Sequence, residues 1–78
     1  MARLEVYGTA RCPYTHEMRE WLEWRRREFV EYDVEVDPEA RKRIRSLTGS
    51  KCNVPVLVED GKVLQMGWQG RSCMVDLE

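Results

Sequence analysis

One cysteine at a predicted strand-to-helix junction constrains this fold more than any other feature. Residues 3–7 alternate polar and apolar side chains, which predicts a half-buried strand. Residues 14–27 carry apolar side chains at spacings of three and four, which predicts an amphipathic helix. Cys12 lies between them, where unpaired N–H groups and the positive end of the helix dipole favour a thiolate over a thiol. Pro13 suits the first helical turn, where a missing N–H removes no hydrogen bond.

The middle of the chain predicts a second strand and a second helix. Residues 28–36 contain β-branched and aromatic side chains that largely alternate with acids, which predicts a strand. Asp37 followed by Pro38 is typical of a helix start, with the aspartate as N-cap. We expect this helix to run to about Thr48 and to stop at Gly49.

The last third of the chain predicts a hairpin. Two apolar runs within residues 54–67 flank Asp60-Gly61, a strong hairpin signal, and Pro55 is expected to open the first of these strands. We expect residues 68–76 to form a loop with at most one turn of helix. Residues 77–78 are interpreted as a cloning scar without a structural role.

The predicted order is therefore β-α-β-α-β-β in one domain, residues 1–76. The β-α-β half predicts two parallel strands with a right-handed crossover, and the hairpin adds antiparallel strands to a mixed four-stranded sheet.

Composition excludes several function classes. The 78 residues carry a net charge of only -1, so no global field recruits nucleic acid or an anionic membrane. No apolar run approaches the roughly 18 residues of a membrane span, and no signal peptide precedes the first strand. Three cysteines are an odd number and do not form the even framework of a secreted disulfide scaffold. A soluble cytoplasmic protein is the expectation.

Three motifs resemble the glutaredoxin branch of the thioredoxin fold. They are Cys-Pro-Tyr-Thr at residues 12–15, Val54-Pro55, and Gly-Trp-Gln-Gly at residues 67–70. With Arg-Ser-Cys at residues 71–73, they look like the small bacterial glutaredoxin-like group called Uxx-star. The resemblance implies an α/β, thioredoxin-like fold and a cis peptide bond before Pro55.

The chain departs from the usual glutaredoxin pattern in three ways. Thr15 stands where the dithiol form has its second cysteine. Residues 67–72 replace the Gly-Gly and acidic pair that help hold glutathione. Too few residues remain for a full C-terminal helix, so this helix is absent or vestigial, and a homodimer would cover the thinly protected sheet face.

The resemblance implies a monothiol-type glutaredoxin, a thiol–disulfide oxidoreductase whose substrates are glutathione mixed disulfides or disulfide-containing proteins. Glutathione or another low-molecular-weight thiol is the expected cosubstrate, and no bound cofactor is expected. Cys12 is the expected nucleophile, helped by the cation of Arg11 and by a hydroxyl hydrogen bond from Thr15. Thr15 has first-turn capping as its alternative role. Tyr14 either presents a ring edge to glutathione or packs in the core.

Val54, beside Pro55, offers a backbone edge that glutathione or a peptide substrate can join like an added strand. Pro13 and Pro55 shape the substrate side of this site. The mixed disulfide is then resolved either by an external thiol or by a second cysteine of the chain. We favour Cys73 over Cys52, because the fold brings the segment after the last strand back beside Cys12, although both cysteines also suit structural roles.

Other functions fit the sequence less well. His16 lies close to Cys12, but a hydrolase pair needs a third, orienting group. One histidine and three scattered cysteines lack zinc-ligand spacing, so no metal site is predicted. The main alternative function is a non-enzymatic carrier that holds a [2Fe–2S] cluster between Cys12 and glutathione in a dimer. A third hypothesis is a thiol-binding adaptor that captures a partner protein through the backbone edge at Val54 without turnover.

Overall fold

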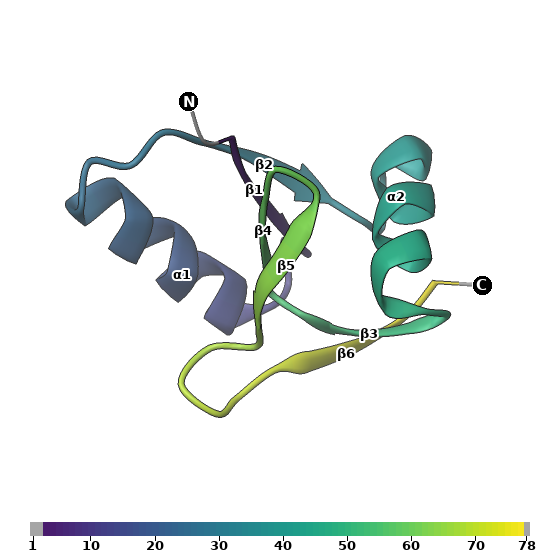
Figure 1. Cartoon of the computed structure of the whole chain (residues 1–78). Coiled ribbons are helices and arrows are strands. Elements are labelled where there is room, and N and C mark those ends of the chain that lie inside the picture. The colour runs from purple at the N-terminus through teal and green to yellow at the C-terminus, as the bar shows by residue number, and fades with distance from the viewer. Residues whose placement is uncertain (1–2, 78) are drawn as a thin grey trace.

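The computed structural model describes residues 3–77 and contains two helices among strands (Figure 1). In chain order the elements are β1 (Leu4–Gly8), α1 (Pro13–Trp24), β2 (Phe29–Asp33), α2 (Pro38–Thr48), β3 (Lys51–Val54), β4 (Val56–Glu59), β5 (Lys62–Met66) and β6 (Cys73–Asp76). No helix within residues 3–77 is both long and apolar enough to cross a membrane.

Four strands form the predicted mixed sheet, in the order β2-β1-β4-β5. β1 pairs in parallel with β2, as expected for a β-α-β unit, and antiparallel with β4. β4 and β5 form the predicted hairpin, whose turn places Asp60 and Gly61 at positive φ angles of 50° and 83°. The thioredoxin-like α/β architecture is thereby confirmed.

The two helices lie on opposite sides of this sheet, as Figure 1 shows. Met18 and Leu22 of α1 pack in one buried cluster with Val6 of β1. Ala40 and Ile44 of α2 pack in a second cluster on the other face. The sheet therefore separates two small cores, and β1 leads from between them to the cysteine loop.

Local signals placed the helix starts correctly. Pro13 occupies the first turn of α1, and Asp37 caps α2 by accepting hydrogen bonds of 3.1 Å from the backbone N–H groups of Glu39 and Ala40. Gly49 ends α2 with a φ of 98°.

The first helix ends earlier than predicted, at Trp24 instead of Arg27. The N–H of Arg27 donates to the carbonyl oxygen of Leu22, and that of Arg26 to Glu23, each at 3.0 Å. Arg26 has a φ of 57°. This is a Schellman-type end in which an arginine takes the left-handed position that glycine usually occupies. The second strand is also shorter than predicted, because the chain turns after Asp33 and buries Val34 while Val36 stays exposed.

The region after α2 is the main correction to the predicted topology. Val54 belongs to β3 and not to the hairpin, which starts after Pro55. Residues 73–76, expected to be loop or one helical turn, form β6, which pairs antiparallel with β3 in a separate two-stranded sheet. The physical reason is a short period-two pattern that buries Val75 and Leu77 and exposes Met74 between Cys73 and Val75.

Leu77, which we assigned no structural role, is only 2% exposed and belongs to the core. Its N–H donates to the carbonyl oxygen of Ser50 at 2.7 Å, which extends the β3–β6 pairing by one residue. Glu78 and residues 1–2 lie outside the described part of the chain.

Candidate active site

Cys12 lies where β1 ends and α1 begins, as predicted. It is the N-cap residue of α1, its backbone is extended, and its side chain makes no capping hydrogen bond. Its carbonyl oxygen accepts from the N–H groups of Thr15 at 3.2 Å and His16 at 3.4 Å. The sulfur therefore lies at the positive end of the helix dipole, a position that stabilises a thiolate after reduction.

The sulfur of Cys12 is bonded to that of Cys73, 61 residues further along the chain. The two Cα atoms are 6.1 Å apart, which is within the usual range for a disulfide. Of the two partners considered from the sequence, the structure thus joins the favoured one to Cys12.

Cys52 is the free cysteine within residues 3–77, and it is buried. Burial raises the pKa of its thiol, against a smaller lowering by a hydrogen bond with Thr48. Cys52 packs in the cluster that contains Ile44 and Val54, so its surroundings are those of a core residue.

A tight turn after β5 brings Cys73 to this place. The N–H of Trp68 donates to the carbonyl oxygen of Arg71 at 2.6 Å, and the N–H of Arg71 donates back at 2.9 Å. Gln69 and Gly70 between them both have positive φ angles, of 52° and 79°. Trp68 itself packs against Trp21 of α1, with ring centroids 5.6 Å apart. The Gly-Trp-Gln-Gly motif is therefore a hairpin-like turn that sends β6 back toward Cys12.

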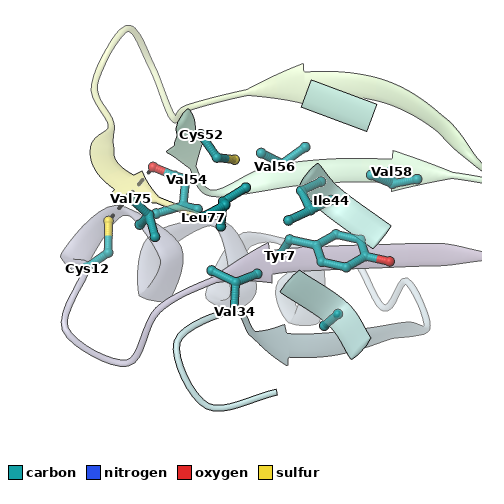
Figure 2. Packing of buried hydrophobic residues seen from close by; sticks show 11 residues of the cluster. Tyr7, Cys12, Val34, Ile44, Cys52, Val54, Val56, Val58, Val75 and Leu77 are labelled. Atoms are coloured by element: carbon teal, nitrogen blue, oxygen red, sulfur yellow. Dashed lines mark hydrogen bonds between the residues drawn. The ribbon is translucent and has the colours of Figure 1, made fainter. Parts of the chain in front are cut away.

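Val54 also lies close to Cys12. The peptide bond between Val54 and Pro55 is cis, as the resemblance implied. The carbonyl oxygen of Val54 lies 3.9 Å from the sulfur of Cys12. Figure 2 draws this contact as a dashed line. The backbone edge that we expected to be open to a substrate is occupied, however, because Val54 pairs with Cys73 of β6.

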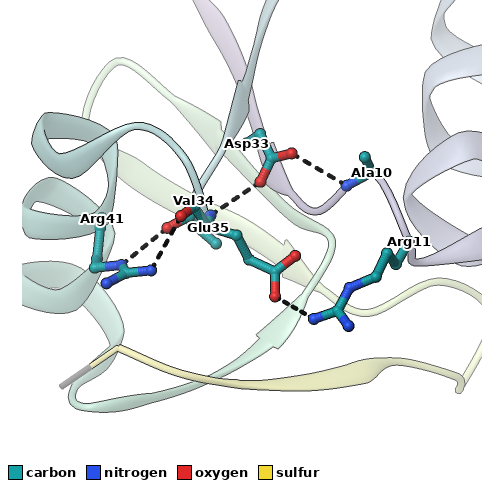
Figure 3. Close-up of polar contacts among 6 residues, drawn as sticks. All are labelled: Ala10, Arg11, Asp33, Val34, Glu35 and Arg41. Carbon is teal, nitrogen blue, oxygen red and sulfur yellow. Dashed lines mark hydrogen bonds and ion pairs between the residues drawn. The ribbon is translucent and has the colours of Figure 1, made fainter.

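Polar contacts hold the cysteine loop against the segment that follows β2 (Figure 3). Asp33 accepts from the N–H of Ala10 at 3.3 Å and from the N–H of Glu35 at 2.9 Å. The guanidinium of Arg11 forms an ion pair with Glu35. The hydrogen bond to Glu35, followed by its charge, raises the pKa of Arg11. Arg11 thus lies beside Cys12 in the chain, but its charge is directed toward a carboxylate.

Arg41 of α2 also binds the segment that follows β2. Its Nε donates to the carbonyl oxygen of Val34 at 2.9 Å and its terminal nitrogen to that of Glu35 at 3.3 Å (Figure 3). Sequence reasoning missed Asp33, Glu35 and Arg41, because no motif marks them. Asp33 and Glu35 also meet partners that lie 23 and 24 residues away in the chain.

His16 supports the cysteine loop and leaves no ring nitrogen for catalysis. An arginine can only donate, so the contact of 2.9 Å from Arg19 makes Nδ1 the acceptor. Nε2 therefore carries the proton and donates to the carbonyl oxygen of Ala10 at 2.8 Å. Both nitrogens are used within this support, which argues against a cysteine–histidine hydrolase.

Thr15 is buried behind the cysteine, and its hydroxyl has no hydrogen-bond partner within residues 3–77. Its side chain packs so closely on Gly8 that a Cβ there would overlap it. Tyr14 is half-buried and contacts both hydrophobic clusters. Pro13 is exposed and Pro55 is buried.

A small pocket of about 190 Å³ opens beside the disulfide. Three segments contribute to its wall, namely the cysteine loop, the segment after β2, and β6. The lining residues are Thr9, Arg11, Cys12, Glu35, Cys73, Met74 and Val75.

Comparison with known proteins supports the interpretation of this geometry. The glutaredoxin family model matches residues 4–64. An uncharacterized glutaredoxin-like 8.6 kDa protein in the rubredoxin operon of Clostridium pasteurianum is 31% identical over 61 residues, which cover 78% of this chain and 80% of the relative. A crystal structure of a mutant of the thioredoxin-like protein BC3987 is 33% identical, with a TM-score of 0.74 over 85% of this chain and 82% of that one. The chain therefore belongs to the glutaredoxin family, with its N-terminal cysteine at the strand-to-helix junction.

Proposed function

We propose that this chain is a thiol–disulfide oxidoreductase in which Cys12 is the nucleophile and Cys73 the resolving thiol. The observation that carries the proposal is the disulfide between Cys12 at a helix N-terminus and Cys73 on β6, with Cα atoms 6.1 Å apart. The Cys-Pro-Tyr-Thr motif itself has a single thiol, so the second one comes from a strand far away in the chain. We also propose that the chain belongs to the Uxx-star group, because residues 12–15 and 67–73 resemble the motifs of that group.

The reaction has two exchange steps. The Cys12 thiolate attacks one sulfur of a substrate disulfide, forms a mixed disulfide and releases the other half as a thiolate. Cys73, after losing its proton to solvent, attacks the Cys12 sulfur, releases the second half as a thiolate and forms the Cys12–Cys73 disulfide. The two thiols of the chain are oxidised and the substrate disulfide is reduced.

An external thiol completes the cycle. Two molecules of glutathione or another low-molecular-weight thiol reduce the Cys12–Cys73 disulfide and leave as their own disulfide. The same thiol also resolves the mixed disulfide on Cys12 directly when Cys73 is absent. We place this chemistry in the reducing cytoplasm.

Thr15 and five other residues complete the proposed site. The buried, unpartnered hydroxyl of Thr15 is proposed to donate a hydrogen bond to the Cys12 thiolate once the disulfide is reduced. The residues proposed to contact substrate are Arg11, Pro13, Tyr14, Val54 and Pro55. Arg11 is supported by its place in the wall of the pocket, and Val54 by its carbonyl oxygen beside the sulfur.

A cluster carrier is less well supported than an oxidoreductase. A [2Fe–2S] cluster needs Cys12 as a free thiolate. Cys73, whose Cα atom is 6.1 Å from that of Cys12, instead forms a disulfide with this sulfur. A homodimer remains part of the proposal, because Val63, Leu64 and Met66 of β5 are exposed apolar side chains that a partner would cover.

Cysteine variants test the proposal. The reduced wild type, with excess glutathione, should reduce a glutathione mixed disulfide, and Cys12→Ser should abolish this activity. In the absence of glutathione, Cys73→Ser should retain the first step and accumulate a glutathione adduct on Cys12, which mass spectrometry detects. Cys52→Ser is the matched control and should behave like the wild type. A Cys12→Ser variant with the wild-type rate would contradict the proposed function.

A further inference from the structure

The strand edge closest to the reactive sulfur is the one on β3. The carbonyl oxygen of Val54, the last residue of β3, is 3.9 Å from the sulfur of Cys12. A polypeptide whose cysteine reacts with Cys12 would lie along this edge, where backbone pairing supplies affinity. In this chain β6 already pairs with β3 over four residues, and Cys73 lies opposite Val54. β6 thus takes the place of a peptide bound through a mixed disulfide.

Contacts other than the disulfide hold β6 in this place. Val75 is 9% exposed and Leu77 2% exposed, and both pack in the cluster that contains Ile44 and Val54. Figure 2 shows both side chains among these buried residues. The N–H of Leu77 also donates to Ser50 at 2.7 Å. None of these contacts involves a sulfur of the disulfide, so they are available to hold β6 on β3 when the disulfide is reduced.

The space that remains beside the sulfur is small. The pocket that contains Cys12 and Cys73 measures about 190 Å³, below the roughly 300–1,000 Å³ of ordinary small-molecule sites. Its walls are Thr9 and Arg11 on one side and Met74 and Val75 of β6 on another. A compact thiol or disulfide group enters this space, whereas an extended chain needs the edge that β6 covers.

We infer that β6 makes the enzyme selective for low-molecular-weight disulfides and excludes cysteines within extended polypeptide strands. This inference rests on the proposed function, since it assumes that Cys12 performs thiol–disulfide exchange. The exchange steps are the two given above, with a small-molecule thiolate as each leaving group.

The test compares two disulfides with the reduced protein. One is bis(2-hydroxyethyl) disulfide, and the other is the symmetric disulfide of a short unstructured peptide with one central cysteine. Each rate constant is divided by that of dithiothreitol with the same disulfide, which removes intrinsic reactivity. We expect the normalised rate constant for the peptide to be lower by about tenfold or more.

Two leucine-to-serine variants form a matched pair. Leu77→Ser weakens the anchoring of β6 and should raise the normalised rate with the peptide relative to the small disulfide. Leu47→Ser makes the same change on α2, at a side chain that is 42% exposed and does not line the pocket, and should leave the wild-type ratio unchanged. Circular dichroism shows whether the Leu77→Ser variant folds. If it does not fold, the ratio of the two normalised rate constants in the wild type tests the inference by itself.

The outcomes separate the two proposals. Equal normalised rates for both disulfides in the wild type would overturn the selectivity of β6 while leaving the oxidoreductase intact. Reaction with neither disulfide, or reaction that persists in Cys12→Ser, would refute the proposed function and the inference with it.

Discussion

Breaking the Cys12–Cys73 bond is expected to lower the free energy of unfolding by about 4 kcal/mol. The bond links residues 61 positions apart and so restricts most of the unfolded chain. For a closed loop of this length the chain-entropy expression gives about 14 cal/mol/K, which is about 4 kcal/mol at 25 °C. That is a large share of the roughly 5–15 kcal/mol by which a typical domain is stable.

Urea denaturation followed by circular dichroism measures this loss. The oxidised wild type is compared with the reduced wild type and with Cys12→Ser and Cys73→Ser. We expect the reduced protein and both variants to unfold at similar, much lower urea concentrations than the oxidised protein. Adding reductant should change neither variant, because each keeps Cys52 together with either Cys12 or Cys73, and Cys52 forms no disulfide in the fold.

Two results would refute this reasoning. An oxidised wild type that unfolds at the same urea concentration as the reduced one would show that the bond does not restrict the unfolded chain. Peptide mapping that finds Cys12 linked to Cys52 would show that the strand pairing of β6 is different from the one described.

Three further predictions concern stability. Arg26→Gly should raise the free energy of unfolding by about 0.5–1 kcal/mol, because glycine adopts the left-handed φ of 57° without steric cost, as urea denaturation would show. Thr15→Val should raise the melting temperature of the oxidised protein, because it removes a buried hydroxyl that has no partner, a group that costs about 1–3 kcal/mol; an unchanged or lower melting temperature would count against this. Burial raises the pKa of Cys52 above 9.0 and that of Tyr7 above 10.0. As the pH rises, both groups ionise first in the unfolded chain. Their contribution to the free energy of unfolding is therefore complete below about pH 9 and is lost as the pH rises through their higher pKa values in the folded protein. Melting temperatures measured from neutral to alkaline pH check this.

Much of the fold was predictable because its signals are local. The cap at Asp37, the stop at Gly49 and the Asp60-Gly61 turn each act within a few residues, so the side chains alone indicate the backbone. The end of α1 was predicted too late, because Arg26 carries no such signal although it adopts the left-handed conformation.

The support of the cysteine loop was not predictable in the same way. Asp33 and Glu35 are 23 and 24 residues from their partners Ala10 and Arg11. These pairs meet only because β1 and β2 lie parallel and adjacent, so that the segments after both strands emerge at the same edge of the sheet.

The sequence by itself determined that a cysteine lies at the N-terminus of a helix in a β-α-β unit, because strand, loop and helix are contiguous and each has its own periodicity. Only the tertiary structure decided which thiol joins it. The pattern at residues 73–77 is too short to identify a strand, and its burial depends on a surface that α2 and β3 form together. Once β6 packs there, Cys73 bonds to Cys12 and the same strand covers the edge beside Val54.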